Sequence, residues 1–170
     1  MKKPDYPLEQ VQLIKKKKLE EAEKILKEKK EALEKEKAKL AALEKERDAV
    51  KVHRDDKLSQ FRSTLDQGTT TDKIQQMKAY LKEVEEKLKV HQKKVSDQTK
   101  NVDVAQKNVD TAREEMLKKQ QEVEKMNLHK KEWEKEIKKI IEQKESLEMD
   151  ETGSTMFSRK QQAAKKHKDS

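Results

Sequence analysis

The chain has no cysteine, two glycines, two prolines and, as its only aromatic residues, one tryptophan, two tyrosines and two phenylalanines. The absence of cysteine excludes a disulfide framework and a cysteine-ligated metal site. So few glycines and prolines exclude a fold rich in tight turns. No apolar run approaches the roughly 18 residues of a membrane span, and residues 1–10 lack the apolar region of a secretory signal. We therefore expect cytoplasmic residence.

Charged residues make up 46% of the chain and hydrophobic residues only 31%. A compact domain usually has about half apolar and a quarter charged residues, so this chain cannot surround a thick core. Low hydrophobicity with high charge indicates either disorder or a coiled coil, whose seam needs only about two apolar residues in seven. The spacing of the apolar residues decides between the two.

The strongest periodicity begins at Ile74 and predicts one long helix. Two heptad positions are mostly apolar. The first reads Ile74, Leu81, Leu88, Val95, Val102, Val109, Met116, Val123, Lys130, Ile137, Lys144. The second reads Met77, Val84, His91, Gln98, Ala105, Ala112, Lys119, Met126, Trp133, Ile140, Leu147. A disordered sequence would not keep one register over so many heptads. We predict a helix over residues 73–148, followed by a flexible basic tail over 149–170.

The first half of the chain carries a thinner seam. Leucines recur every seven residues at positions 19, 26, 33 and 40, but Lys29 and Glu36 occupy the complementary position. After Val50 the phase slips before the stripe continues, which changes supercoiling locally without ending a helix. We predict a helix over residues 8–65, preceded by an extended segment over 1–7.

The only strong interior break lies at residues 66–72. Gly68 is suited to the left-handed conformation that ends a helix, and Thr71 or Asp72 is suited to cap the next one. A short connection between two long amphipathic helices brings them together antiparallel. The predicted fold is therefore all-α, with two long helices in an antiparallel coiled-coil hairpin, favoured over a kinked parallel dimer. A monomer is favoured over a homodimer.

This pairing leaves the end of the second helix uncovered. If Leu65 faces Ile74, Leu8 lies near Lys131 and the first helix ends there. The remaining apolar residues of the second helix are Trp133, Ile137, Ile140, Ile141 and Leu147. An exposed apolar stripe usually marks a partner site, and tryptophan is typical of interface anchors. Alternatively, residues 1–7 fold back over the stripe, or two hairpins dimerise through it.

Nothing in the sequence indicates catalysis. The carboxylates lie on solvated helix faces rather than in a desolvated pocket, and no glycine-rich phosphate loop is present. His53, His91, His129 and His167 are too far apart to share a turn, and His91 is interpreted as a polar seam residue that helps set register. We expect no cofactor, metal or small-molecule substrate. Nucleic-acid binding is disfavoured because acidic residues closely follow the lysine run at 15–18.

Both ends of the chain resemble the YscO/FliJ family of type III secretion proteins. The resemblance rests on Tyr6-Pro7-Leu8-Glu9-Gln10-Val11, on Leu19-Glu20-Glu21-Ala22-Glu23-Lys24, on Trp133-Glu134-Lys135-Glu136-Ile137, and on Asp150-Glu151-Thr152-Gly153 with Met156-Phe157. It spans nearly the whole chain and is closest to YscO-like members.

The resemblance implies a non-enzymatic stalk of the secretion export apparatus, located in the cytoplasm or peripherally at the inner membrane. Implied partners are the export ATPase, the export gate, secretion chaperones and the needle-length regulator. The end of the hairpin that holds the termini would bind the ATPase. The partner-binding residues that we predict are Leu13, Lys15, Lys16, Lys17, Lys18, Trp133, Ile137, Ile140, Ile141, Leu147, Met156 and Phe157. The alternatives are a spacer that self-associates through Trp133, Ile137 and Ile140, or a basic nucleic-acid-binding coiled coil.

Overall fold

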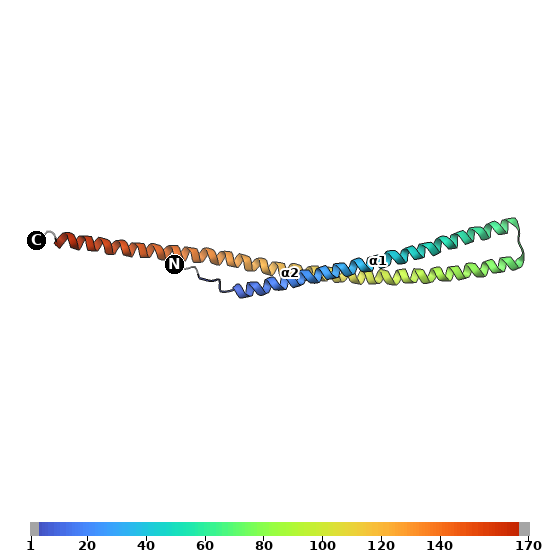
Figure 1. Cartoon of the computed structure of the whole chain (residues 1–170), viewed down its shortest axis with the longest axis horizontal. Helices are drawn as coiled ribbons and strands as arrows, with labels where there is room; N and C mark the ends of the chain where they lie inside the picture. The colour runs from blue at the N-terminus through green and yellow to red at the C-terminus, as the bar shows by residue number, and fades with distance from the viewer. Residues whose placement is uncertain (1–3, 167–170) are drawn as a thin grey trace. The chain divides into compact units, whose positions relative to one another are not determined.

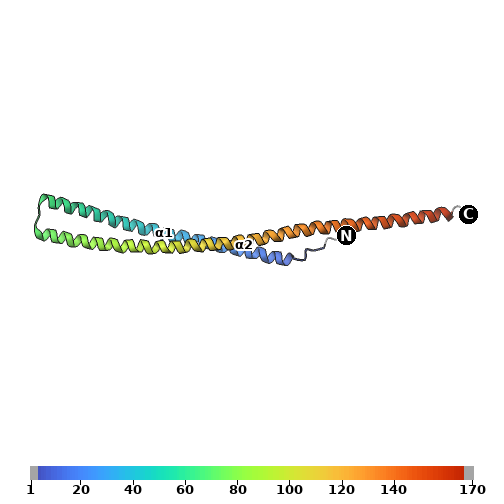
Figure 2. The same cartoon turned by 180° about the vertical axis from the view of Figure 1, so that it is seen from behind.

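The fold consists of two long helices joined by a short loop. The computed structural model describes residues 4–166, and the side chains of residues 4–162. Helix α1 spans Glu9–Gln67 and helix α2 spans Thr71–Lys166. Figures 1 and 2 show the loop that reverses the chain between them. The predicted all-α hairpin is confirmed.

Two compact units make up the chain, one of Glu21–Leu117 and one of Met1–Glu20 with Lys118–Ser170.

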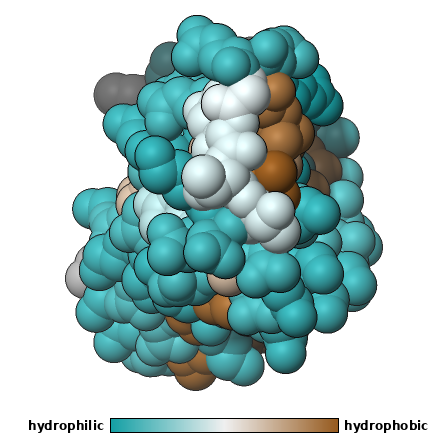
Figure 3. Space-filling model, turned by 90° about the vertical axis from the view of Figure 1, so that its right-hand side faces the viewer, coloured by the Kyte–Doolittle hydropathy of each residue, from teal (hydrophilic) through white to brown (hydrophobic). Residues whose placement is uncertain are grey.

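The reversal within the first unit depends on Gly68. This glycine has a φ of 82°, in the left-handed region that residues with a Cβ rarely adopt. Its N–H donates to the carbonyl of Leu65 at 3.2 Å, and the N–H of Ile74 donates to the carbonyl of Thr70 at 3.1 Å. The loop is thus shorter than the predicted residues 66–72. Seen from the loop end, the surface is mostly polar, with a band of intermediate hydropathy in front and small apolar patches beside and below it (Figure 3).

The core of this unit is the predicted coiled-coil seam. Leu26 and Leu33 of α1 pack in one buried cluster with Val109 and Ala112 of α2, and Val109 is only 2% exposed. Along α2, every residue of the two predicted heptad positions from Ile74 to Ile137 is buried or half-buried. The predicted register is therefore confirmed over that length.

Polar pairs occupy the seam where apolar residues are missing. Gln98 donates from Nε2 to the Glu36 carbonyl at 3.1 Å and to its carboxylate at 2.5 Å. Lys39 donates to the same carboxylate at 2.8 Å. The bonds from Lys39 and Gln98 stabilise the charged form and hold the pKa of Glu36 below its usual value. His91, also in the seam, lies 3.8 Å from Glu46.

Helix α2 continues well beyond the end predicted near residue 148. The tail predicted as flexible is helical as far as Lys166, so that prediction was wrong there, and residues 167–170 lie outside the described part. Gly153 costs a helix only about 1 kcal/mol relative to alanine, and no proline follows it. The hydroxyl of Thr152 donates to the Glu148 carbonyl at 2.7 Å. At the other terminus, residues 4–6 precede α1 without helical structure as predicted, whereas 1–3 are outside the description.

Candidate protein-binding site

The second unit, which we call the open end, holds the start of α1 and the last part of α2. Tyr6 fixes the entry into α1, because its carbonyl accepts from the N–H of Glu9 at 3.2 Å. Its side chain is only 5% exposed. The ring packs edge-on against Trp133, with 5.3 Å between centroids, and the hydroxyl lies 2.6 Å from Nδ1 of His129. Nζ of Lys130 lies 5.6 Å from the centre of the same ring.

Polar contacts continue along the interface of the open end. Gln12, 5% exposed, donates from Nε2 to Oδ1 of Asn127 at 2.6 Å. Lys130 forms an ion pair with Glu9 at 3.5 Å. Both pairs follow the register predicted by placing Leu65 opposite Ile74. Because a buried amide is costly when unpaired, the Gln12–Asn127 bond favours this register over shifted ones.

The four predicted lysines do not form one basic patch. Lys15 contacts α2, where its Nζ lies 2.8 Å from Oε2 of Glu122. The hydrogen bond from Lys15, together with the charge of Lys119, holds the pKa of the Glu122 carboxyl below its usual value. Lys16, Lys17 and Lys18 are exposed. Successive residues on a helix point about 100° apart, so these lysines spread around α1.

Trp133 is not the free anchor that the sequence predicted. Tyr6 packs against it, so the alternative in which the N-terminal segment folds back over the stripe holds at this residue. Trp133, Ile137 and Ile141 are half-buried, whereas Ile140 is 45% and Leu147 64% exposed. On α1, Leu13 is 50% exposed. Along the apolar stripe of α2, the most accessible predicted positions are therefore Ile140 and Leu147.

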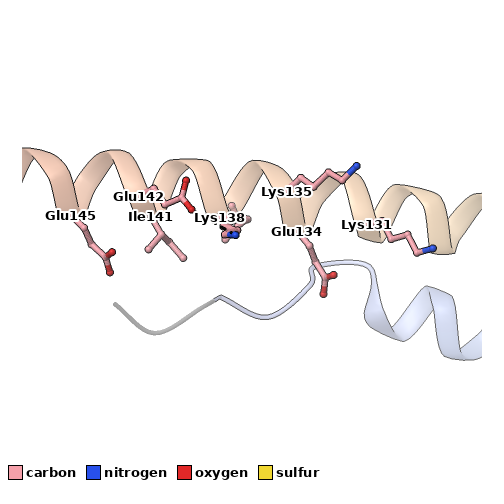
Figure 4. A pocket seen from close by; sticks show the side chains of 8 residues that line it. Lys131, Glu134, Lys135, Lys138, Ile141, Glu142 and Glu145 are labelled. Atoms are coloured by element: carbon pink, nitrogen blue, oxygen red, sulfur yellow. Dashed lines mark ion pairs between the residues drawn. The ribbon is translucent and has the colours of Figure 1, made fainter.

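A groove of about 630 Å³ runs along α2 beside this stripe. Its lining consists of two isoleucines among charged side chains, namely Ile137 and Ile141 with Lys131, Glu134, Lys135, Lys138, Glu142 and Glu145. Figure 4 shows Glu134, Ile141 and Glu145 pointing to the same side of the helix. An apolar floor between charged rims is suited to a protein segment with apolar and charged side chains.

Met156 and Phe157 are not brought together with that stripe. They are 67% and 65% exposed, but the seam register after Leu147 passes through Glu151 and Ser154 instead. The two residues therefore lie on a different face of α2 from Ile140. Sequence analysis could not separate these faces because it expected no helix there.

Sequence analysis also missed the pairing of Tyr6 with His129 and that of Gln12 with Asn127. The predicted register, extended by two residues beyond Leu8, places Tyr6 opposite Trp133, and His129 lies one helical turn before Trp133. The register therefore carried a signal that Tyr6 approaches this part of α2. The polar pair carried no such signal, since glutamine and asparagine on a charged helix are ordinary surface residues.

Two further properties bear on what the site can do. Among the residues that the structure describes, no group of three or more histidine, cysteine, aspartate or glutamate side chains is placed to hold a metal ion. In the same part of the chain, neither helix contains an apolar stretch long enough to cross a membrane.

Comparisons with known proteins identify the family. A family model described as "YscO-like protein" matches residues 3–163. The solved structure of CT670 from Chlamydia trachomatis, a proposed YscO homolog, is 44% identical with a TM-score of 0.88, covering 94% of this chain and 98% of that one. No curated protein sequence matches the chain. The chain therefore belongs to the YscO-like family, a family of coiled-coil proteins related to type III secretion.

Proposed function

We propose that this protein is a non-enzymatic stalk of a type III secretion export apparatus and that its open end binds the export ATPase. The observation that supports this proposal is the apolar surface that α2 retains beyond the contact with Tyr6. Ile140 and Leu147 occupy seam positions, yet they are 45% and 64% exposed. Exposed apolar residues in line with a packed seam are typical of a docking surface.

The first turns of α1 supply the second element of this surface. Leu13 is half exposed, and Lys16, Lys17 and Lys18 surround the helix with positive charge. Spread lysines act as point charges that increase the rate of encounter with an acidic partner rather than as bidentate contacts. In this account the apolar stripe supplies most of the affinity, and the lysines supply a salt-dependent association rate.

The test replaces apolar side chains that the fold does not bury. The variant Ile140→Ser with Leu147→Ser removes the stripe. Its matched control is Val90→Ser with Val104→Ser, which changes residues of α2 that are 55% and 57% exposed in the other unit. Titration into the cognate export ATPase should show at least tenfold weaker binding for the first variant than for the wild type. The control variant should bind as tightly as the wild type. Equal affinity of both variants for the ATPase would mean that Ile140 and Leu147 do not contribute to binding.

The wider family context belongs to the same proposal. Cytoplasmic residence, with peripheral attachment to the secretion apparatus at the inner membrane, would place the open end beside the ATPase. Binding to the export gate, to secretion chaperones and to the needle-length regulator is proposed on the family resemblance. Among these partners, we assign Ile140, Leu147 and the first turns of α1 to the ATPase alone.

A further inference from the structure

The last part of α2 lacks the packing that normally stabilises a helix. Every residue from Glu142 to Gln162 is exposed. Most helix stability in proteins comes from burying one face, and this segment buries none within the described residues. A partner that covers one face of this segment would therefore stabilise it.

One face of this segment has the shape of a helix-packing surface. Met149, Gly153, Met156 and Lys160 recur at spacings of four, three and four, so they share a side of α2. We call this the Met149–Lys160 face. Met149 is 76% and Met156 67% exposed, and nothing lies within 4 Å of a Cβ placed on Gly153. Met149 and Gly153 help to line a shallow depression of about 530 Å³ in the surface of this face. A glycine between two methionines lets another helix approach closely.

The first half of this segment is acidic and the second half is basic, so two antiparallel copies would have complementary charges. Residues 140–151 contain five acidic residues and one lysine, and residues 152–166 contain four basic residues and no acidic one. Within residues 4–162, Glu148, Asp150, Arg159 and Lys160 form no ion pair with each other or with other side chains. An antiparallel copy of the segment would place each acidic half opposite a basic half. A parallel copy would place like charges together.

We propose that the Met149–Lys160 face binds the same face of a second copy of this chain, antiparallel. With the two-fold axis between Ser154 and Thr155, Met156 of each copy packs over Gly153 of the other. With this axis, Glu148 lies within one helical turn of Arg159 of the other copy, and Asp150 lies within one turn of Lys160 of the other copy. A second copy is favoured over an unrelated protein because one sequence supplies both halves of the charge pattern.

This interface differs from the one proposed for the ATPase, and it changes the expectation of a monomer. The sequence favoured a monomer because the break at residues 66–72 was interpreted as an intramolecular reversal rather than as a kink in a parallel dimer. The proposed contact lies on the part of α2 that the sequence analysis did not expect to be helical. Ile140 and Leu147 are outside it, so loss of self-association would leave the proposed ATPase contact unaffected.

The test measures the mass of the full chain by sedimentation equilibrium at increasing concentration and low salt. The wild-type mass should rise from 20.1 kDa toward that of a dimer. Two variants reverse the charges, one with Glu148→Lys and Asp150→Lys, the other with Arg159→Glu and Lys160→Glu. Each alone should remain monomeric at concentrations where the wild type is mostly dimeric. An equimolar mixture should recover the dimer, because each copy then meets opposite charge.

A matched control reverses two exposed lysines elsewhere on α2, with Lys93→Glu and Lys107→Glu, and should dimerise like the wild type. A wild-type mass that stays at that of the monomer at every concentration would overturn the proposal. So would a dimer that neither reversal weakens, since its interface would lie elsewhere. Failure of the mixture to recover the dimer would overturn the antiparallel arrangement.

Discussion

The hydroxyl of Tyr6 lies 2.6 Å from Nδ1 of His129, joining residues that are 123 positions apart in the sequence. The same ring packs against Trp133 with 5.3 Å between centroids. One buried side chain thus holds the segment before α1 against α2. Beyond this contact, Ile140 and Leu147 are the accessible part of the stripe.

Replacing Tyr6 should separate the contribution of its hydroxyl from that of its ring. Tyr6→Phe should cost about 1 kcal/mol of unfolding free energy, the value of a typical net hydrogen bond. Tyr6→Ala should cost about 3 kcal/mol, because Trp133 loses its ring contact. Urea unfolding measures both, and the emission of the single tryptophan should shift to longer wavelength only in the alanine variant.

Tyr80→Phe is the matched control for this experiment. The Tyr80 hydroxyl lies 2.9 Å from Nε2 of His53, but Tyr80 is 43% exposed. Water replaces an exposed hydrogen bond at little cost, so the change should stay within about 0.5 kcal/mol. An equal loss in the Tyr6→Phe and Tyr80→Phe variants would mean that Tyr6 is not buried in solution.

Truncating the seam should destabilise the unit of residues 21–117. Leu33 is 5% exposed within the buried cluster, so Leu33→Ala should cost about 2–4 kcal/mol. Ile25 is 46% exposed, and Ile25→Ala should change stability by no more than about 0.5 kcal/mol. Thermal unfolding followed by circular dichroism measures both, and similar melting temperatures for the two variants would contradict the seam register.

Acid should weaken the hairpin through Glu36 and Glu122. Their pKa values are lowered in the folded chain, by Lys39 and Gln98 at Glu36 and by Lys15 and Lys119 at Glu122. The unfolded chain therefore binds more protons at these groups. Their contribution is present above the ordinary pKa of a glutamate in the unfolded chain and is lost as pH falls through the lower folded values.

Glutamine at both positions should accordingly reduce the fall in melting temperature between pH 6 and pH 3. The control changes Glu31 and Glu86, which are both exposed, to glutamine. Its melting temperature should follow the wild type across this range. A double variant Glu36→Gln, Glu122→Gln that is as sensitive to acid as the wild type would argue against these ion pairs.

The continuation of α2 past Gly153 can be tested by substitution at that glycine. Nothing lies within 4 Å of the position, so alanine fits without a clash and should raise the helical signal in far-ultraviolet circular dichroism. Gly153→Pro should lower it, because proline removes a helical hydrogen bond. An unchanged signal in the proline variant would mean that residues around 153 are not helical in solution.

Periodicity predicted the two helices and the α2 register, and the short break at residues 66–72 predicted their antiparallel pairing. Apolar residues from Ile74 onward repeat in one phase, and Gly68 has the freedom that a reversal requires. The residue at which α2 ends could not be predicted from hydrophobic periodicity. Hydrophobic periodicity stops at Leu147, but a helix needs only backbone hydrogen bonds and suitable residues, so it continues through a single glycine to Lys166.

The candidate site was predicted less completely than the fold. The position of the apolar stripe followed from the register, because Ile140 and Leu147 continue the seam beyond the start of α1. The covering of Trp133 by Tyr6 depends on how a non-helical segment bends, which no period encodes. The exposed Met149–Lys160 face required knowing that the last part of α2 is a helix.

The central claim is that the open end binds the export ATPase, and light scattering tests it most directly. The full chain is mixed with the cognate ATPase and separated by size exclusion at low micromolar concentration. We expect a single complex whose mass exceeds that of the ATPase alone by that of this 20.1 kDa chain. The variant Ile140→Ser with Leu147→Ser should elute separately from the ATPase. Separate elution of the wild-type chain and the ATPase would contradict it.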